Sequence, residues 1–270
     1  MPPLRVAIAG LGAIGLEVAH RLDQGTVTGL ELAAISVRDA DKARRKLVGF
    51  RTQPKLVALA ELALEADIVV ECVPAEYFRA AAEPPIRLGR ILMPLSVGAL
   101  IGHIYLVDLA RETGARIVVP SGAIAGLDAV RAVAEGEVES IRLVTRKPPA
   151  SLAGAPYLVE NGITVDGIKE PLLLFSGSAR DAFRGFPANL NVSVALALAG
   201  IGPDRTEVEL WADPTVGRNT HTITVKSNSS DLTVMIENKP SAENPRTGTI
   251  TALSVIAALR RQTAPLVIGT

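Results

Sequence analysis

The first half of the chain alternates short apolar runs with segments of helical spacing. The apolar runs end at glycine or polar residues, as buried parallel strands do. The predicted strands are Arg5–Ala9, Leu32–Val37, Asp67–Val73, Arg90–Leu95 and Ala115–Val119. The predicted helices are Ala13–Leu22, Asp39–Leu47, Leu56–Leu64 and Ile104–Thr113. This alternation favours an α/β fold with a Rossmann-type, mostly parallel sheet and right-handed crossovers.

After about Pro120 the pattern changes to partial period-two alternation, which favours an antiparallel sheet with one covered face. The predicted strands there are Ser140–Thr145, Thr206–Ala212, Thr222–Val225 and Asp231–Glu237, and the predicted helices are Ser178–Phe183, Val192–Leu198 and Thr249–Arg261. We therefore expect a dinucleotide-binding domain over residues 1–122 and an α+β catalytic and dimerisation domain over residues 123–245. The C-terminal helix, within residues 246–270, is expected to pack back on the first domain.

Composition narrows the class of protein. The chain has 270 residues, of which 48% are hydrophobic, and its 28 basic side chains balance 28 acidic ones. Zero net charge offers no field for a polyanion, so we expect no nucleic-acid partner. The longest charge-free stretches are interrupted by proline, glycine or asparagine, so we expect no membrane span and a cytoplasmic protein. A single cysteine excludes an internal disulfide framework.

A glycine motif joins the first predicted strand to the first predicted helix. Gly10, Gly12 and Gly15 form a G-x-G-x-x-G pattern, with Ala13 and Ile14 at the start of the helix. In such motifs the first glycine permits a tight turn, the second lets the backbone approach a pyrophosphate, and the third lets the helix pack on the strand. Free amides and the helix dipole then favour the anion. These five residues are predicted to bind NAD or NADP, although a glycine turn that serves packing alone has the same pattern.

The end of the second predicted strand bears on the choice of cofactor. NAD enzymes carry an acid there for the adenosine ribose, whereas this strand ends in Arg38, with Asp39 one place further on. An arginine at this point accommodates the 2′-phosphate of NADP. We predict that Arg38 binds the cofactor and that NADP is used, with or without NAD. A solvated loop charge is the alternative.

Several separate segments resemble the L-aspartate dehydrogenase family, in the same order along nearly the whole chain. They are Gly10–Gly15, Leu95–Leu100, Pro120–Asp128, Thr145–Pro149, Phe186–Val192, Asn219–His221 and Asn238–Thr247. The resemblance implies NAD(P)-dependent oxidation of L-aspartate to iminoaspartate, which hydrolyses to oxaloacetate and ammonia, and a link to nicotinamide nucleotide synthesis. It also implies that His221 is catalytic and that Ala123 and Asn189 contact the cofactor. The chain departs from the family pattern at Gly248, where serine is frequent, and over Cys72–Tyr77.

Histidine is the side chain that titrates near neutral pH, so the three histidines are the first candidates for proton chemistry. His20 lies on the first predicted helix among apolar residues, where a structural role is expected. His103 lies at the start of a predicted helix, where a capping or surface role is expected. From the residues alone the role of His221 stays open, and the resemblance assigns it as the catalytic base. The three histidines show no metal-ligand spacing, so no metal is expected.

A dicarboxylate substrate needs cationic or amide partners. The predicted substrate-binding residues are Asn191, Lys147, Asn244 and Thr247. Arg146 is a further candidate, and an exposed Arg146–Lys147 pair before the two prolines is the alternative. If residues 189–191 are extended, Asn189 and Asn191 share a face. An apolar sheet face in the second domain would make a homodimer surface.

Two other functions remain open at this point. A homoserine-dehydrogenase-like or dihydrodipicolinate-reductase-like oxidoreductase has the same two-part layout. A catalytically silent NAD(P)-binding sensor would need the glycine motif alone. Turnover with L-aspartate against homoserine separates the two enzymes, and cofactor binding without turnover would indicate the sensor.

Overall fold

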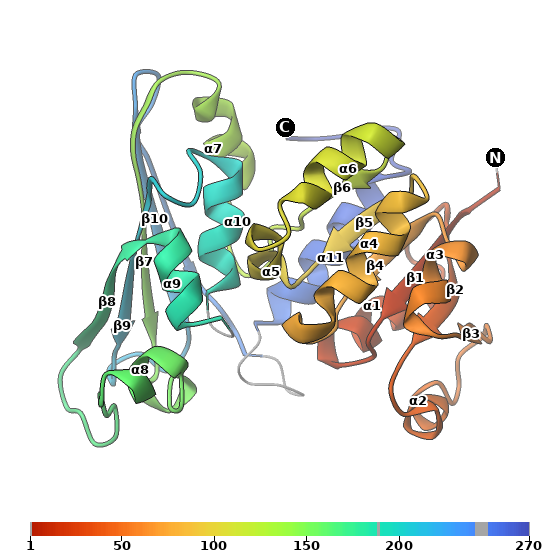
Figure 1. Ribbon diagram of the computed structural model, residues 1–270, viewed down its shortest axis with the longest axis horizontal. Helices are drawn as coiled ribbons and strands as arrows, with labels where there is room; N and C mark the ends of the chain where they lie inside the picture. The colour runs from red at the N-terminus through yellow and green to blue at the C-terminus, as the bar shows by residue number, and fades with distance from the viewer. Residues whose placement is uncertain (1, 188–189, 241–247, 270) are drawn as a thin grey trace. The chain divides into compact units, whose positions relative to one another are not determined.

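The chain folds into two compact units. The computed structural model describes residues 2–187, 190–240 and 248–269. The first unit comprises the residues up to Pro120 together with Thr251–Val267, and the second comprises Ser121–Ile250 with the last residues from Ile268 on. Figure 1 follows the chain from its red N-terminal strands to the blue helix α11, which belongs mainly to the first unit.

The first unit contains a six-stranded sheet in the order β3-β2-β1-β4-β5-β6. All of its strand pairs are parallel. This is the strand order of dinucleotide-binding folds. The order in which the chain adds strands reverses between β1 and β4, and ligands bind at such a point. The strands are β1 (Leu4–Ala9), β2 (Leu30–Ser36), β3 (Lys55–Leu56), β4 (Ile68–Glu71), β5 (Ile91–Pro94) and β6 (Arg116–Ile117).

Helices connect these strands and cover the sheet. They are α1 (Ala13–Asp23), α2 (Ala40–Lys46), η1 (Leu59–Glu61), α3 (Leu62–Glu65), η2 (Ala75–Tyr77), α4 (Phe78–Arg87), α5 (Val97–Ile101), α6 (Tyr105–Thr113) and α11 (Thr249–Arg261). Among the described residues, no helix is both long and apolar enough to cross a membrane.

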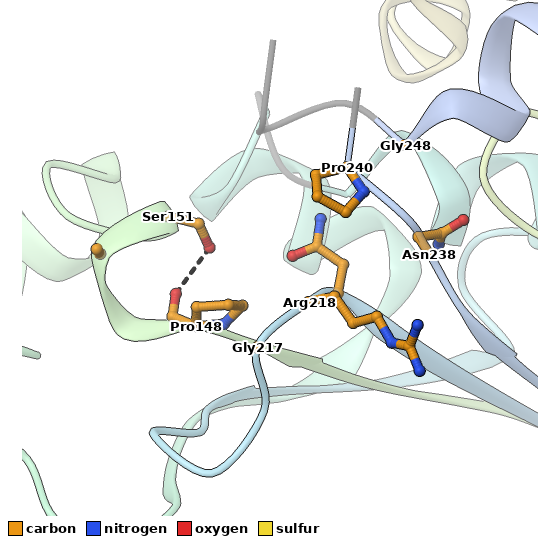
Figure 2. Close-up of a pocket in the computed structure, with 9 residues that line it drawn as sticks. Pro148, Ser151, Gly217, Arg218, Asn238, Pro240 and Gly248 are labelled. Atoms are coloured by element: carbon orange, nitrogen blue, oxygen red, sulfur yellow. Dashed lines mark hydrogen bonds between the residues drawn. The ribbon is translucent and has the colours of Figure 1, made fainter. Parts of the chain in front are cut away.

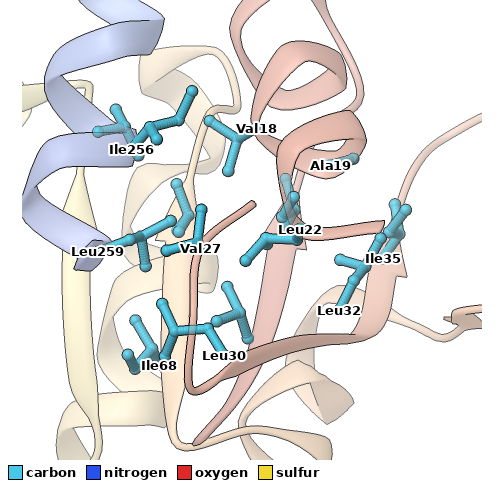
Figure 3. Close-up of a cluster of buried hydrophobic side chains, with 14 of the residues drawn as sticks. Val18, Ala19, Leu22, Val27, Leu30, Leu32, Ile35, Ile68, Ile256 and Leu259 are labelled. Atoms are coloured by element: carbon cyan, nitrogen blue, oxygen red, sulfur yellow. The ribbon is translucent and has the colours of Figure 1, made fainter. Parts of the chain in front are cut away.

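Helix α11 completes the core of the first unit although it follows the whole second unit in sequence. Its Ile256 and Leu259 pack with Val18 and Leu22 of α1 and with Ile68 of β4 (Figure 3). Each such side chain contributes about 1.5–3 kcal/mol when it is fully buried. The periodic apolar positions of Thr249–Arg261 therefore have their partner in the N-terminal sheet.

The second unit contains a five-stranded sheet in the order β11-β10-β7-β9-β8. Its elements are α7 (Leu127–Ala134), β7 (Val138–Lys147), η3 (Pro149–Ser151), α8 (Pro156–Glu160), β8 (Leu172–Ser178), α9 (Ala179–Gly185), α10 (Asn191–Ala199), β9 (Thr206–Ala212), β10 (Thr220–Ser227) and β11 (Leu232–Glu237). Helices α7, α9 and α10 lie on one face of this sheet (Figure 1). Alternate residues of β7 and β10 are buried on that covered face, among them Ile141, Leu143, Ile223 and Val225.

The structure corrects the sequence-based expectations in several places. The second sheet is mixed, because β7 and β9 run parallel. The predicted helix Leu56–Leu64 is divided between the end of β3, a 3₁₀ turn and α3. The sequence analysis did not predict helices α4, α5, α7 and α8 or strands β3 and β8.

Candidate active site

The glycine loop between β1 and α1 adopts the geometry that its sequence predicts. The amide of Gly10 donates to the Ser36 carbonyl at 2.9 Å, and its φ of +95° lies in the region that favours glycine. A Cβ at Gly10 would lie 2.6 Å from the carbonyl oxygen of Cys72. A Cβ at Gly15 would lie 2.1 Å from the carbonyl oxygen of Gly10, so this glycine lets α1 approach the turn. Both glycines are therefore required by the fold itself.

Gly12 differs from the other two glycines because no contact among the described residues requires a glycine there. It is the N-cap of α1 with an ordinary φ of −77°, and no heavy atom of the described residues lies within 4 Å of the place where its Cβ would be. No side-chain hydrogen bond caps this helix. The amides of its first turn and the open space at Gly12 fit a pyrophosphate. Lys46 of α2 donates to the Leu11 carbonyl at 2.8 Å and so steadies the loop.

The end of β2 has an exposed arginine and an acid that is already used. The carboxylate of Asp39 accepts the amide of Lys42 at 2.8 Å and caps α2. Arg38 is exposed, and within the described ranges no acid forms an ion pair with it. A carboxylate engaged as a helix cap is less available to a ribose hydroxyl, whereas the guanidinium of Arg38 has no such engagement.

A buried carboxylate joins the loops that follow β4 and β5. Glu71 is fully buried at the end of β4 and accepts the amides of Val73 at 2.9 Å and Ser96 at 2.9 Å. It also accepts the Ser96 hydroxyl at 3.0 Å. Burial raises the pKa of the Glu71 carboxyl, and these hydrogen bonds oppose that rise. Glu71 thus holds two loops together at the carboxyl edge of the sheet, where α/β folds bind ligands.

In the second unit, the covered face of the sheet turns polar at one end. Strands β7 and β10 present apolar residues on this face up to the pair Leu143–Ile223, and the next pair is Thr145–His221. Lys147 follows two residues later on the same face of β7. All three side chains are buried, with exposed fractions of 0% for Thr145, 5% for Lys147 and 2% for His221. The register therefore builds a buried polar cluster of Thr145, Lys147 and His221.

The electrostatics of this cluster keep His221 neutral. Burial and, to a smaller extent, the neighbouring charge of Lys147 together lower the pKa of His221 from 6.5 to about 3. Burial also lowers the pKa of Lys147 from 10.5 to about 8. The Nδ1 atom of His221 lies 3.0 Å from Oγ1 of Thr145, a neutral partner that does not favour the imidazolium as a carboxylate would.

This neutral histidine makes folding sensitive to acid. Below its ordinary pKa of 6.5 the unfolded chain binds a proton at His221, and the folded chain does not until about pH 3. Stability is therefore complete above pH 6.5 and decreases as the pH falls. We expect the free energy of unfolding to fall by about 2 kcal/mol between roughly pH 7 and pH 5 because of His221. Urea denaturation at the two pH values measures the loss.

The matched control for this measurement is His221→Gln, which keeps a polar side chain but cannot titrate. The variant should lose about 2 kcal/mol less than the wild type over the same interval, whatever its stability at neutral pH. Equal losses in the two proteins would show that His221 takes up its proton in the folded state as readily as in the unfolded one.

Arg146 and Lys147 do not act as the exposed pair that the sequence also allowed. As neighbours on a strand they point to opposite faces of the sheet. Arg146 donates to the Asp213 carboxylate at 2.9 Å, and its guanidinium carbon lies 4.9 Å from the centre of the Trp211 ring. Arg146 is therefore already paired with a carboxylate of the protein, and Lys147 is the cation that lies on the same face of the sheet as His221.

A pocket of about 300 Å³ opens where β7 ends and β10 begins (Figure 2). Pro148, which follows Lys147, lines it together with Asn219, which precedes β10. Asn238 lies at its edge and donates from Nδ2 to the Ala123 carbonyl at 3.0 Å. The pocket is also lined by Ala150, Ser151, Gly217, Arg218, Pro240 and Gly248. The backbone, hydroxyl and amide groups of these residues form a suitable site for a small polar ligand.

The other predicted site residues have the following places. Ala123 lies in the loop before α7, where Asn238 holds its carbonyl. Asn191 is the first residue of α10, so the extended geometry that would put it on one face with Asn189 does not hold at Asn191. Asn189, Asn244 and Thr247 lie outside the described residues.

The sequence analysis did not identify Thr145, Asn238 or Glu71 as site residues. Thr145 could have been found, because period-two alternation puts it on the covered face with Leu143 and Lys147. Asn238 and Glu71 gave no such signal, since their roles depend on loops that lie far from them in sequence. Among the described residues, no group of three or more histidine, cysteine, aspartate or glutamate side chains is placed to hold a metal ion.

Comparison with protein families divides the chain near the same place as its fold does. Residues 10–120 match the family model described as homoserine dehydrogenase, NAD binding domain. Residues 128–262 match the model described as aspartate dehydrogenase, C-terminal. The chain thus matches an NAD-binding domain in its first part and an aspartate dehydrogenase domain in its second.

Individual relatives agree with this assignment along the whole chain. An L-aspartate dehydrogenase from Bradyrhizobium diazoefficiens is 55% identical over 99% of this chain and 94% of its own length. L-aspartate dehydrogenase 3 from Bordetella bronchiseptica is 52% identical over 99% of this chain and 98% of its own. The crystal structure of aspartate dehydrogenase from Thermotoga maritima has the same fold, with a TM-score of 0.75, 24% identity and coverage of 98% and 99% of the two chains. The chain belongs to the L-aspartate dehydrogenase family.

Proposed function

We propose that this enzyme oxidises L-aspartate to iminoaspartate with NAD or NADP, and that hydrolysis then gives oxaloacetate and ammonia. The observation that carries the proposal is the full-length identity of 55% to a protein named L-aspartate dehydrogenase. The buried cluster of Thr145, Lys147 and His221 supports it, because it offers a neutral imidazole and a cation to an amino-dicarboxylate.

The first unit binds the cofactor. The amides at the start of α1 and the open space at Gly12 receive the pyrophosphate. When bound, the nicotinamide supplies the chemistry of hydride acceptance from the α-carbon of the substrate. The Glu71–Ser96 contacts keep the loops at the strand ends in a fixed conformation for that purpose.

The second unit handles the substrate and its proton. The lysine ammonium is charged below its pKa of about 8 and attracts a substrate carboxylate. The α-amino group must be neutral before it can form the imine, so His221 acts as the base that takes its proton or activates water for hydrolysis. Burial is the main cause of the low pKa of His221, and the charge of Lys147 is the second. A substrate carboxylate beside Lys147 offsets that charge and so makes the imidazole a better base.

A direct assay tests this function. Formation of reduced cofactor is followed by its absorbance with L-aspartate and, separately, with homoserine, each with NAD and with NADP. We expect turnover with L-aspartate alone. Turnover with homoserine instead would favour a homoserine-dehydrogenase-like reaction. Cofactor binding without turnover on either amino acid would indicate an NAD(P)-binding sensor.

Arg38 is expected to determine the affinity for NADP. Replacement by alanine removes the cation proposed to meet the 2′-phosphate, so the dissociation constant for NADP should rise about tenfold or more while that for NAD stays nearly unchanged. Titration calorimetry of both cofactors against wild type and Arg38→Ala measures the two constants. The neighbouring exposed Lys42→Ala is a matched control for the loss of one positive charge. An unchanged NADP constant in Arg38→Ala would rule out the proposed role.

The uncovered face of the second sheet favours a homodimer. It presents Leu173, which is 42% exposed, and Met235, which is 63% exposed, on the side opposite the helices. Apolar side chains on a sheet face are a suitable self-complementary surface. Light scattering of the purified protein should give twice the chain mass of 28.3 kDa.

A cytoplasmic location and a role in nicotinamide nucleotide synthesis are parts of the same proposal.

A further inference from the structure

Thr145 is a buried polar residue in the middle strand of the second sheet. It lies directly opposite His221 in the antiparallel pairing of β7 with β10, and Leu210 of β9 lies beside it on the other side. A buried hydroxyl costs about 1–3 kcal/mol unless it forms a hydrogen bond. Oγ1 of Thr145 lies 3.0 Å from Nδ1 of His221, within hydrogen-bond distance. The imidazole is therefore the hydrogen-bond partner of this buried hydroxyl.

This contact decides what the imidazole can offer to a ligand. It occupies Nδ1 and limits rotation of the ring, so Nε2 is the nitrogen left for substrate chemistry. A neutral imidazole carries a single N–H, and a base must present a lone pair. If the hydroxyl donated to Nδ1, the ring proton would already occupy Nε2 and no proton could be accepted there. If Nδ1–H donates to the hydroxyl, the lone pair at Nε2 is free.

The second arrangement also survives the proton transfer. When Nε2 takes a proton, the imidazolium carries N–H groups on both nitrogens. Its Nδ1–H still donates to Oγ1 of Thr145, so the ring need not turn during the reaction. In the other arrangement the ring would have to accept its proton at Nδ1 and lose the hydrogen bond.

We propose that Thr145 is the positioning residue of His221: its hydroxyl accepts the Nδ1–H of the imidazole and so holds the tautomer whose Nε2 lone pair takes the proton. This inference rests on the proposed role of His221 as the base. It adds a residue, Thr145, that decides the tautomer and orientation of that base.

Nitrogen-15 spectra of the histidine side chains test the tautomer without any turnover. The chain has three histidines, so the spectrum of the uniformly labelled protein is simple, and His221→Gln identifies the signals of His221. His103 is an internal standard, because its Nδ1 lies 2.9 Å from the Ala99 carbonyl, which can only accept. We expect His221 to show the same Nδ1–H pattern as His103. An Nε2–H pattern at His221 in the wild type would overturn the proposal.

Variants of Thr145 provide the second arm. Thr145→Ser keeps the hydroxyl and should retain the Nδ1–H tautomer and a kcat within about threefold of wild type. Thr145→Val is nearly isosteric but cannot accept, so it should lose the single tautomer and lower kcat about tenfold or more, with a smaller change in KM for L-aspartate. Equal kcat values and the same tautomer in all three proteins would overturn the positioning role.

The two arms separate this inference from the proposed function. Full activity in a His221 variant would contradict the base itself, whatever the tautomer. If His221 variants are inactive but Thr145→Val matches the wild type, the base stands and the positioning role of Thr145 fails. If Thr145→Val does not fold, the wild-type spectrum and Thr145→Ser still decide.

Discussion

Replacing His221 by alanine is expected to lower kcat with L-aspartate by about 10²–10⁴-fold, the usual contribution of general acid–base catalysis. The imidazole is buried, neutral and hydrogen-bonded through Nδ1, so no solvent molecule of comparable basicity replaces it readily. Binding of the cofactor by the first unit should be unchanged, because His221 belongs to the second unit. Initial rates over a range of pH and calorimetric titration of the cofactor measure the two effects.

His103→Ala is the control for this experiment. His103 is a histidine of the first unit whose Nδ1 bonds the Ala99 carbonyl, and its ring packs 5.5 Å from that of Phe78. Its loss should change stability and leave kcat near the wild-type value. If His221→Ala kept more than about half of the wild-type kcat at every pH, general base catalysis by this residue would be excluded.

The cofactor half of this protein follows closely from local sequence signals. The glycine motif, the apolar runs and the helical spacing all act within a few residues, and the structure confirms the Rossmann-type sheet they predict. Helix α4 escaped prediction because Pro84 and Pro85 lie inside it, where proline removes backbone donors. Helix α5 escaped prediction because it has only five residues, one of which is Gly98, and glycine disfavours a helix interior.

The structure of the second unit depends on contacts between residues far apart in sequence, which local sequence patterns do not contain. The environment of His221 exists because β10 pairs with β7, a strand 76 residues earlier. From the sequence, Arg146 and Lys147 are both candidates for binding the substrate. The pairing of β7 with β10 shows that Lys147 lies on the same face as His221, whereas Arg146 donates a hydrogen bond to Asp213. A shift of one residue in that register would exchange the two roles.

Substitutions of two glycines of the loop, Gly12 and Gly15, should separate the stability of the fold from cofactor binding. Gly15→Ala puts a Cβ 2.1 Å from the Gly10 carbonyl oxygen and 3.2 Å from Ile8, so α1 must move. We expect a loss of about 1–3 kcal/mol or more, seen as a thermal midpoint lower by several degrees. Gly12→Ala meets no atom within 4 Å and needs no unusual φ, so its midpoint should stay close to that of the wild type.

Binding should show the opposite order of effects. The methyl group of Gly12→Ala occupies the space through which the backbone approaches the pyrophosphate, so the dissociation constants for NAD and NADP should both rise about tenfold or more. Because this variant keeps its fold, the loss is attributable to the phosphate site alone, and Arg38→Ala, which should affect NADP alone, is its complement. Wild-type affinity in Gly12→Ala would mean that the open space at α1 serves no cofactor. The proposed oxidation of L-aspartate would then lack a bound cofactor to accept the hydride.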